Sequence, residues 1–592
     1  MTAILTEPTA KPAKIVWPRL AQFHLWHWLV FLVVLALVSL PLGFLVLGSF
    51  STASLPTDFS FARMDLSNYE DVWFDPTTYP LFVNTAIYVT GSTAIGLSIA
   101  VTLAWLVERT NIPGKMWIYG FVPMTLAMPG MLQAMAWVLL LSPKIGFINL
   151  AAMWAFNLEK MPFTVYSITG MVVIEGIRLV PTAFLMLVPL LRSMDPTLEE
   201  AAAMSGAGPL SMLRRVTFRL MLPGLLAVLI YQAMTALEVF EVPGILGIPG
   251  GIYVFSTKIY AVLHTATGIP EYGKANALAL IYVVIAVVAT TLYSRVIAKS
   301  EKYTIVTGKG YRPREMDLGR WKWPAIALIA AFLLVSIILP FFVLLYVSFL
   351  PFMQVPTTAA FKSMSFENYL ELGRQELIGR VMLNTVIMVV ITSTMTVIVS
   401  FLISTIVVRS KFWGRKVLDQ MAFLPHAVPG IVMGLAFLWV FLRLDNYGID
   451  IHGGILAISI AFTVSFMSYG TRATNAAILQ IHKDLEEAAQ VSGAPYWRTM
   501  WRVFFPLMMP TLVGVWVWSM LHAVRQAGTP LILYEGSDNQ VLGVFIWNLW
   551  DRGEIPIVGA IGVLLILGLL VITMLLRFMG FGRGAHVQKT KG

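Results

Sequence analysis

The chain has 592 residues, of which 58% are hydrophobic and only 12% are charged, and its formal net charge is +10. A soluble domain carries about twice that share of charged residues, so the composition excludes an ordinary soluble protein and predicts an all-α integral membrane protein. The absence of cysteine excludes disulfides, thiolate metal sites and cysteine nucleophiles.

Apolar blocks of about 20 residues, the length that crosses the hydrocarbon core of a bilayer, recur along the whole chain. The first, Trp28 to Gly48, is too long for the apolar region of a signal peptide and lacks a clear cleavage site, so we interpret it as a retained span. Twelve transmembrane helices are predicted in all. They begin near Leu25, Leu81, Trp117, Phe163, Leu220, Ala275, Trp323, Met382, Val417, Gly454, Leu507 and Pro556.

The predicted helices divide the chain into two halves with polar segments around them. A cytoplasmic tail (1–24) precedes the first half (25–297), a basic linker (298–322) leads to the second half (323–580), and a basic tail (581–592) follows. Most of the 41 lysines and arginines fall in loops that share one side of the membrane if the N-terminus is cytoplasmic. The positive-inside rule therefore predicts that both termini and the linker are cytoplasmic.

An internal repeat relates the two halves. The decapeptide "LEEAAAMSGA" from Leu198 returns 287 positions later as "LEEAAQVSGA" from Leu485. An offset of 300 aligns further pairs upstream: Asn68-Tyr69 with Asn368-Tyr369, Asn84-Thr85 with Asn384-Thr385, and Pro129-Gly130 with Pro429-Gly430. Because six spans is an even number, both halves have the same orientation, and the sequence predicts two parallel six-helix repeats related by an axis along the membrane normal.

The repeated decapeptide lies between the fourth and fifth predicted spans of each half, on the predicted cytoplasmic side. It consists of helix-forming residues followed by Ser-Gly, and the glycine permits the left-handed backbone that ends a helix. One such helix could be an ordinary solvated surface helix. Two copies on the same face of a pseudo-twofold protein favour a docking surface for a partner.

The spacing Glu-Ala-Ala, three residues, Gly, nine residues and an aliphatic residue resembles the EAA loop of binding-protein-dependent ABC importer permeases. The matching residues are Glu200, Ala201, Ala202 and Gly206 in the first copy, and Glu487, Ala488, Ala489 and Gly493 in the second. The second copy also has the family's proline, as Pro506, whereas the first has Arg219 at that position.

This resemblance implies the type I ABC importer permease fold in a bacterial inner (cytoplasmic) membrane. Each EAA loop would form a coupling helix that docks on one of two separate ATPase subunits, which bind ATP and Mg²⁺. The chain has no Walker A sequence, so we expect a permease that catalyses no reaction and binds no cofactor of its own. A periplasmic solute-binding protein would deliver the cargo.

The fusion of two halves resembles the permeases of ferric-iron uptake, although relatives in the same group carry thiamine, polyamines, phosphonates, sulfate or sugar phosphates. The alternative class is a secondary active transporter with 6+6 parallel repeats. Such a carrier needs no ATPase and has no reason to repeat the EAA loop.

Charged residues inside predicted spans usually face a cavity or each other. Glu175 and Arg178 lie three residues apart on one helix, which favours an internal ion pair. Glu238 and Glu241 carry like charge, and Glu238 aligns with Arg525 at the 287 offset. These three residues are the predicted lining of the translocation pathway, where Glu238 and Arg525 could pair, gate, or contact a charged solute. The histidines lack metal-ligand spacing, so no metal site is predicted.

Overall fold

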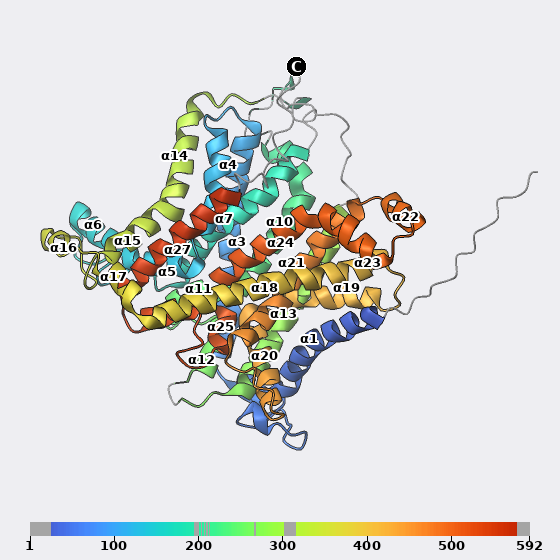
Figure 1. The fold of residues 1–592 in the computed structure, drawn as a ribbon. Coiled ribbons are helices and arrows are strands. Elements are labelled where there is room, and N and C mark those ends of the chain that lie inside the picture. The colour runs from blue at the N-terminus through green and yellow to red at the C-terminus, as the bar shows by residue number, and fades with distance from the viewer. Residues whose placement is uncertain are drawn as a thin grey trace, which may run out of the picture.

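The computed structural model describes residues 25–193, 201–202, 204–206, 208, 211, 213–265, 268–300 and 315–576. This part of the chain is helical, with three isolated β-bridges and no longer strand (Figure 1). The expected tails 1–24 and 581–592, and the centre of the expected linker, lie outside the described residues.

The α-helices of the first half are α1 (Leu25–Ser49), α2 (Ser67–Phe74), α3 (Thr78–Arg109), α4 (Lys115–Met124), α5 (Gly130–Leu141), α6 (Phe147–Phe156), α7 (Ile168–Ser193), α10 (Phe218–Glu238), α11 (Glu241–Leu246), α12 (Phe255–Leu263) and α13 (Tyr272–Ser300). Those of the second half are α14 (Lys322–Leu333), α15 (Leu339–Ser348), α16 (Thr358–Lys362), α17 (Glu367–Arg374), α18 (Glu376–Arg409), α19 (Arg415–Phe423), α20 (Gly430–Asp445), α21 (Ile455–Gln480), α22 (Lys483–Val491), α23 (Tyr496–Thr499), α24 (Phe505–Arg525), α25 (Gly528–Leu533), α26 (Leu542–Asp551) and α27 (Ile555–Leu576).

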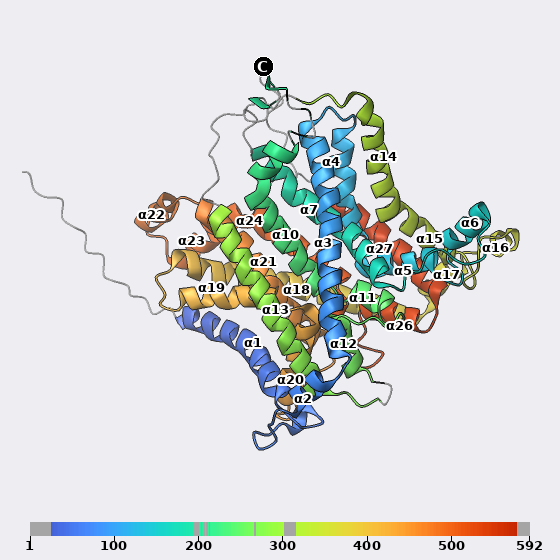
Figure 2. The same cartoon turned by 180° about the vertical axis from the view of Figure 1, so that it is seen from behind.

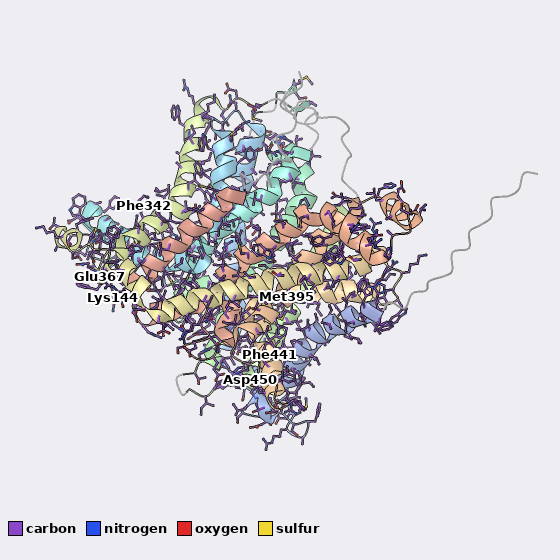
Figure 3. The ribbon with its side chains drawn as sticks, viewed as in Figure 1. Lys144, Phe342, Glu367, Met395, Phe441 and Asp450 are labelled. Atoms are coloured by element: carbon purple, nitrogen blue, oxygen red, sulfur yellow. The ribbon has the colours of Figure 1, made fainter. Side chains whose placement is uncertain are left out.

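Nine helices of the described part are long and apolar enough to cross a membrane, and three strongly bent helix pairs bring the number to twelve if each pair is one span. All twelve predicted spans therefore correspond to helices. The outer faces of these helices are apolar: Figure 3 labels Phe342 on α15 and Met395 on α18, whose side chains are 58% and 45% exposed. Such faces suit contact with lipid.

The third span of each half is not the single helix that its apolar run suggests. The helix Lys115–Ala127 meets Gly130–Leu141 at 91°, and Arg415–Ala427 meets Gly430–Asp445 at 115°. Both bends occur at the repeated Pro-Gly pair, where Pro129 and Pro429 have extended backbones. Proline lacks an N–H and pushes the preceding residue out of the helical region, so the bend is encoded locally in both halves.

The two halves are interlocked through their first helices. The helix α1 packs against α13 of its own half and against α19 and α20 of the other, while α15 packs against α27 of its own half and against α5 of the other. Seen from behind, α1 and α13 converge towards their lower ends (Figure 2). Across the halves, Phe59 contacts Trp439 and Phe147 contacts Tyr346, with ring centroids 6.2 and 5.5 Å apart. One hydrophobic core therefore serves both repeats.

The repeated asparagines hold together the turns that follow α1 and α15. Asn68 donates to the carbonyls of Ser49 and Ser51, and Asn368 donates to those of Ser348 and Leu350. Because these carbonyls lie at the ends of α1 and α15, each asparagine satisfies backbone groups that a helix end leaves unpaired. The repeat thus preserves a structural contact here.

Candidate functional site

The second EAA segment forms a short exposed helix, α22, followed by a turn. Gly493 has φ +75°, and the N–H of Ala494 donates to the carbonyl of Ala489 at 3.0 Å. This is the left-handed helix stop that the Ser-Gly sequence predicts. Glu487 and Ala488 are exposed, and Ala489 is half-buried.

The first EAA segment repeats this geometry where the structure describes it. Ala201 and Ala202 are helical, the N–H of Ser205 donates to the carbonyl of Ala201 at 3.1 Å, and Gly206 has φ +83°. Glu200 lies outside the described residues. Both predicted segments are therefore helix–turn elements of the same design.

Apolar side chains on the EAA segments are exposed in the described part of the chain. Met204 is 85% exposed, and Val491 and Leu485 on α22 are 80% and 46% exposed. The helix α22 projects from the body of the molecule, at the right in Figure 1, on the side away from α6 and α17. A protruding helix with an apolar face is typical of a docking surface.

A π-helical turn follows each EAA segment and leads into the fifth span. The turns are Leu213–Thr217 and Met500–Phe504, which occupy equivalent positions at the 287 offset. Single π-helical turns are rare and are often found at functional sites. These turns were not predicted from the sequence, where their only signal is the continued match of the repeat through these residues.

Two arginines bind the ends of the helices that lead into the EAA segments. Arg409, at the end of α18, donates from Nη2 to the carbonyls of Ile478 (2.9 Å) and Ile481 (2.5 Å). Arg109, at the end of α3, donates from Nη2 to the carbonyl of Leu191 at 2.8 Å. Their equivalence at the 300 offset is visible in the sequence, but the helices they bind are not.

The end of the linker is joined to the first half beside Arg109. The N–H of Met316 donates to the carbonyl of Arg109 at 2.9 Å, and the N–H of Asn111 donates to the carbonyl of Met316 at 3.0 Å. Asn111 also donates to Asp317 (2.7 Å), and Lys115 pairs with Glu315 (2.8 Å). Residues 315–318 are thus bound to the α3–α4 loop.

The predicted ion pair on the fourth span is confirmed. Arg178 donates to both carboxylate oxygens of Glu175, from Nη2 at 2.6 Å and from Nε at 2.8 Å. Glu175 is fully buried, and a bidentate pair is the form in which a buried carboxylate is best compensated.

Glu238 and Arg525 are not paired within the described part of the chain. Arg525 lines a small cavity with Arg178, Gln133 and Ser336, which brings residues of both halves together. Its Nε has no hydrogen-bond partner among the described residues.

Glu241 makes a hydrogen bond between the halves, whereas Glu238 makes none within the described residues. The Oε1 of Glu241 accepts from the N–H of Ala527 at 3.0 Å, at the start of α25. A carboxylate at a helix N-terminus satisfies a free N–H and opposes the positive end of the helix dipole.

Both fifth spans break directly after their charged residues. The helix α10 ends at Glu238 and α24 ends at Arg525; short buried helices, α11 and α25, follow after two residues. Non-helical backbone at membrane depth is tolerated where it is buried in protein or lines a cavity. The predicted pathway residues therefore flank equivalent breaks in the centre of the molecule.

Comparisons with known proteins agree with this architecture. The family model described as "Binding-protein-dependent transport system inner membrane component" matches residues 76–302 and 396–581. The ferric transport system permease protein FbpB of Actinobacillus pleuropneumoniae is 26% identical over 82% of this chain and 68% of its own length. The putative ferric transport system permease protein FbpB 1 of Haemophilus influenzae is 25% identical over 78% and 70%.

A shorter match is the sulfate transport system permease protein CysT of Synechocystis, which is 24% identical over 30% of this chain and 65% of its own length. The family match covers both repeats, with one EAA segment in each matched region. The chain belongs to the family of binding-protein-dependent transport system inner membrane components and is a permease with two such domains in one polypeptide.

Proposed function

We propose that this permease imports ferric iron, delivered by a periplasmic binding protein, with energy from two ATPase subunits that dock on the EAA segments. The observation that carries the proposal is the pair of exposed helix–turn segments at equivalent positions. The two relatives named as ferric transport permeases match most of the chain, which supports the cargo. Family membership does not favour the secondary-transporter alternative.

The docking would place Leu485, Val491 and Met204 in grooves of the ATPase subunits, where their exposed apolar surface becomes buried. The predicted orientation puts these segments and both termini in the cytoplasm. The extracytoplasmic turns held by Asn68 and Asn368 would then face the binding protein. Closing and opening of the ATPases would rock the halves between inward-open and outward-open forms.

A specific observation favours an oxyanion as the second candidate cargo. Arg525 lines a small cavity between the halves, its Nε has no hydrogen-bond partner among the described residues, and guanidinium groups bind oxyanions well. The sulfate permease CysT of Synechocystis also resembles part of this chain.

Uptake into proteoliposomes separates these cargoes. The complex is purified from its own membrane with its ATPase, reconstituted, and supplied with its binding protein and either ⁵⁵Fe(III) or ³⁵S-sulfate. ATP-dependent uptake of ⁵⁵Fe that unlabelled sulfate does not reduce supports the proposal. ATP-dependent uptake of sulfate, with no uptake of iron, would identify sulfate as the cargo and would still support an ATP-driven importer.

A further inference from the structure

In the second half, one arginine contacts the protein on both sides of the EAA segment. The guanidinium of Arg409 binds the carbonyls of Ile478 and Ile481, where α21 ends and just before α22 begins at Lys483. Its Cζ also lies 5.3 Å from the ring centre of Phe504, in the π-helical turn that follows the segment. The end of α18 is therefore connected to the entrance and to the exit of the segment.

The first half repeats the entrance contact. Arg109 is 3% exposed and binds the carbonyl of Leu191, the position equivalent to Ile478. Burying a guanidinium is costly unless it is well hydrogen-bonded. Here the positive charge lies at the negative end of a helix dipole, and charge-assisted hydrogen bonds compensate it.

We propose that Arg109 and Arg409 are positioning residues that transmit motion between the EAA segments and the second spans, α3 and α18. The proposal rests on the proposed docking of ATPases at these segments. In each half the second span packs along the fourth, α3 along α7 and α18 along α21. An arginine that binds the end of the fourth span to the end of the second makes both helices and the EAA segment of that half move together. Without it, the segment would move while the spans remain in place.

We call the contacts of Arg109 and Arg409 with the helix ends the first and the second joint. The two joints differ in strength. Next to Leu191, Arg192 forms an ion pair with Glu108, with Nε and Oε1 2.7 Å apart. The equivalent positions in the second half are Leu479 and Val408, which are apolar. The first joint therefore keeps a connection when its arginine is removed, whereas the second loses its only charged link within the described residues.

Distances between spin labels measure this connection in the permease alone. The chain has no cysteine, so pairs of cysteines can be introduced and labelled at exposed positions. The pair Val491 and Met395 reports on the second half, and the pair Met204 and Ala94 reports on the first. In nanodiscs, Arg409→Gln should broaden only the Val491–Met395 distribution. Arg109→Gln should broaden only the Met204–Ala94 distribution, and to a smaller degree.

The matched control is Arg415→Gln, because within the described residues the Arg415 side chain binds only the nearby carbonyl of Ser410, and it should change neither distribution. Arg409→Lys keeps a positive donor and should give an intermediate width, which also shows that the fold tolerates a change at this position. Unchanged distributions in Arg409→Gln would overturn the proposal.

Coupling provides the second readout. In the complex with its ATPase, Arg409→Gln should retain ATPase binding and basal hydrolysis but lower the stimulation by loaded binding protein about tenfold, as expected for the loss of a charged hydrogen bond. Full stimulation would contradict the transmission role. If no ATPase accompanies the permease, the proposed function fails, while the spin-label result still tests the joint.

Discussion

At the scale of single residues, contacts within one helix could be predicted and contacts between helices could not. The three-residue spacing of Glu175 and Arg178 determines their proximity, so the pair followed from the sequence. The alignment of Glu238 with Arg525 establishes equivalence under the pseudo-twofold axis, and equivalent residues need not touch. Packing instead brings Glu241 to the start of α25.

The contact between Glu241 and Ala527 leads to a stability prediction. Glu241→Ala removes the acceptor for the N–H of Ala527, the residue before α25, and should cost about 1 kcal/mol, whereas Glu241→Gln keeps an acceptor oxygen and should cost less. Thermal unfolding in detergent, followed by the fluorescence of the 18 tryptophans, measures both. Equal losses in the two variants would show that the charge, and not the acceptor, stabilises this end.

Asp75, in the loop before α3, leads to a pH prediction. Burial raises the pKa of Asp75, but hydrogen bonds from Thr77 and the charges of Lys274 and Lys258 outweigh it and lower the pKa to about 2. Because the folded pKa lies below the usual 3.8, the stabilisation is present above about pH 4 and is lost as the pH falls towards 2. It is on the order of 1–2 kcal/mol.

Asp75→Asn should therefore lower the melting temperature at pH 6 and flatten its decline between pH 5 and pH 3. Melting curves across this range, with Asp450→Asn as an exposed control, test this expectation. A decline as steep as that of the wild-type protein would assign the acid sensitivity to other carboxylates.

At the scale of elements, the sequence predicted the spans and the EAA helices but missed the short buried helices after each fifth span. α11, α12, α25 and α26 are apolar and largely buried, and short apolar runs cannot be distinguished from parts of a span by periodicity. The repeat did identify residues that hold two of these helices in place. Asn84 donates to the carbonyl of Tyr253, before α12, and Asn384 donates to that of Gln540, before α26.

The hydrogen bonds of Asn384 and Asn84 differ, and their contributions to stability can be compared. Asn384 donates to two carbonyls, those of Asp538 and Gln540, whereas Asn84 donates to one, that of Tyr253. Since a buried carbonyl left unpaired costs about 1–3 kcal/mol, and Gln540 is buried whereas Tyr253 is half-buried, Asn384→Ala should lower the melting temperature more than Asn84→Ala. Asn539→Ala, which removes one exposed hydrogen bond, is the control. The opposite order would mean that the number of bonds does not determine stability here.

At the scale of the whole molecule, the repeat predicted two parallel halves, and the family match covers both. The packing of α1 and α15 against the opposite halves could not be predicted, because a uniformly apolar helix surface does not specify which helix packs against it. The linker, expected only as a connection, binds the α3–α4 loop through Met316 and Asp317. Both features add contacts between segments that are far apart in the sequence.

If the EAA segments couple this permease to ATP hydrolysis, changes in these segments should uncouple hydrolysis from the binding protein. ATP hydrolysis by the reconstituted complex is measured with and without loaded binding protein, for the wild-type protein, Glu487→Lys and Glu200→Lys. Because Glu487 is exposed on α22, its replacement should abolish the stimulation while the permease keeps its wild-type melting temperature. Glu200→Lys should also reduce the stimulation, and less severely, since Arg219 replaces the family's proline in that copy. Wild-type stimulation in Glu487→Lys would contradict the account.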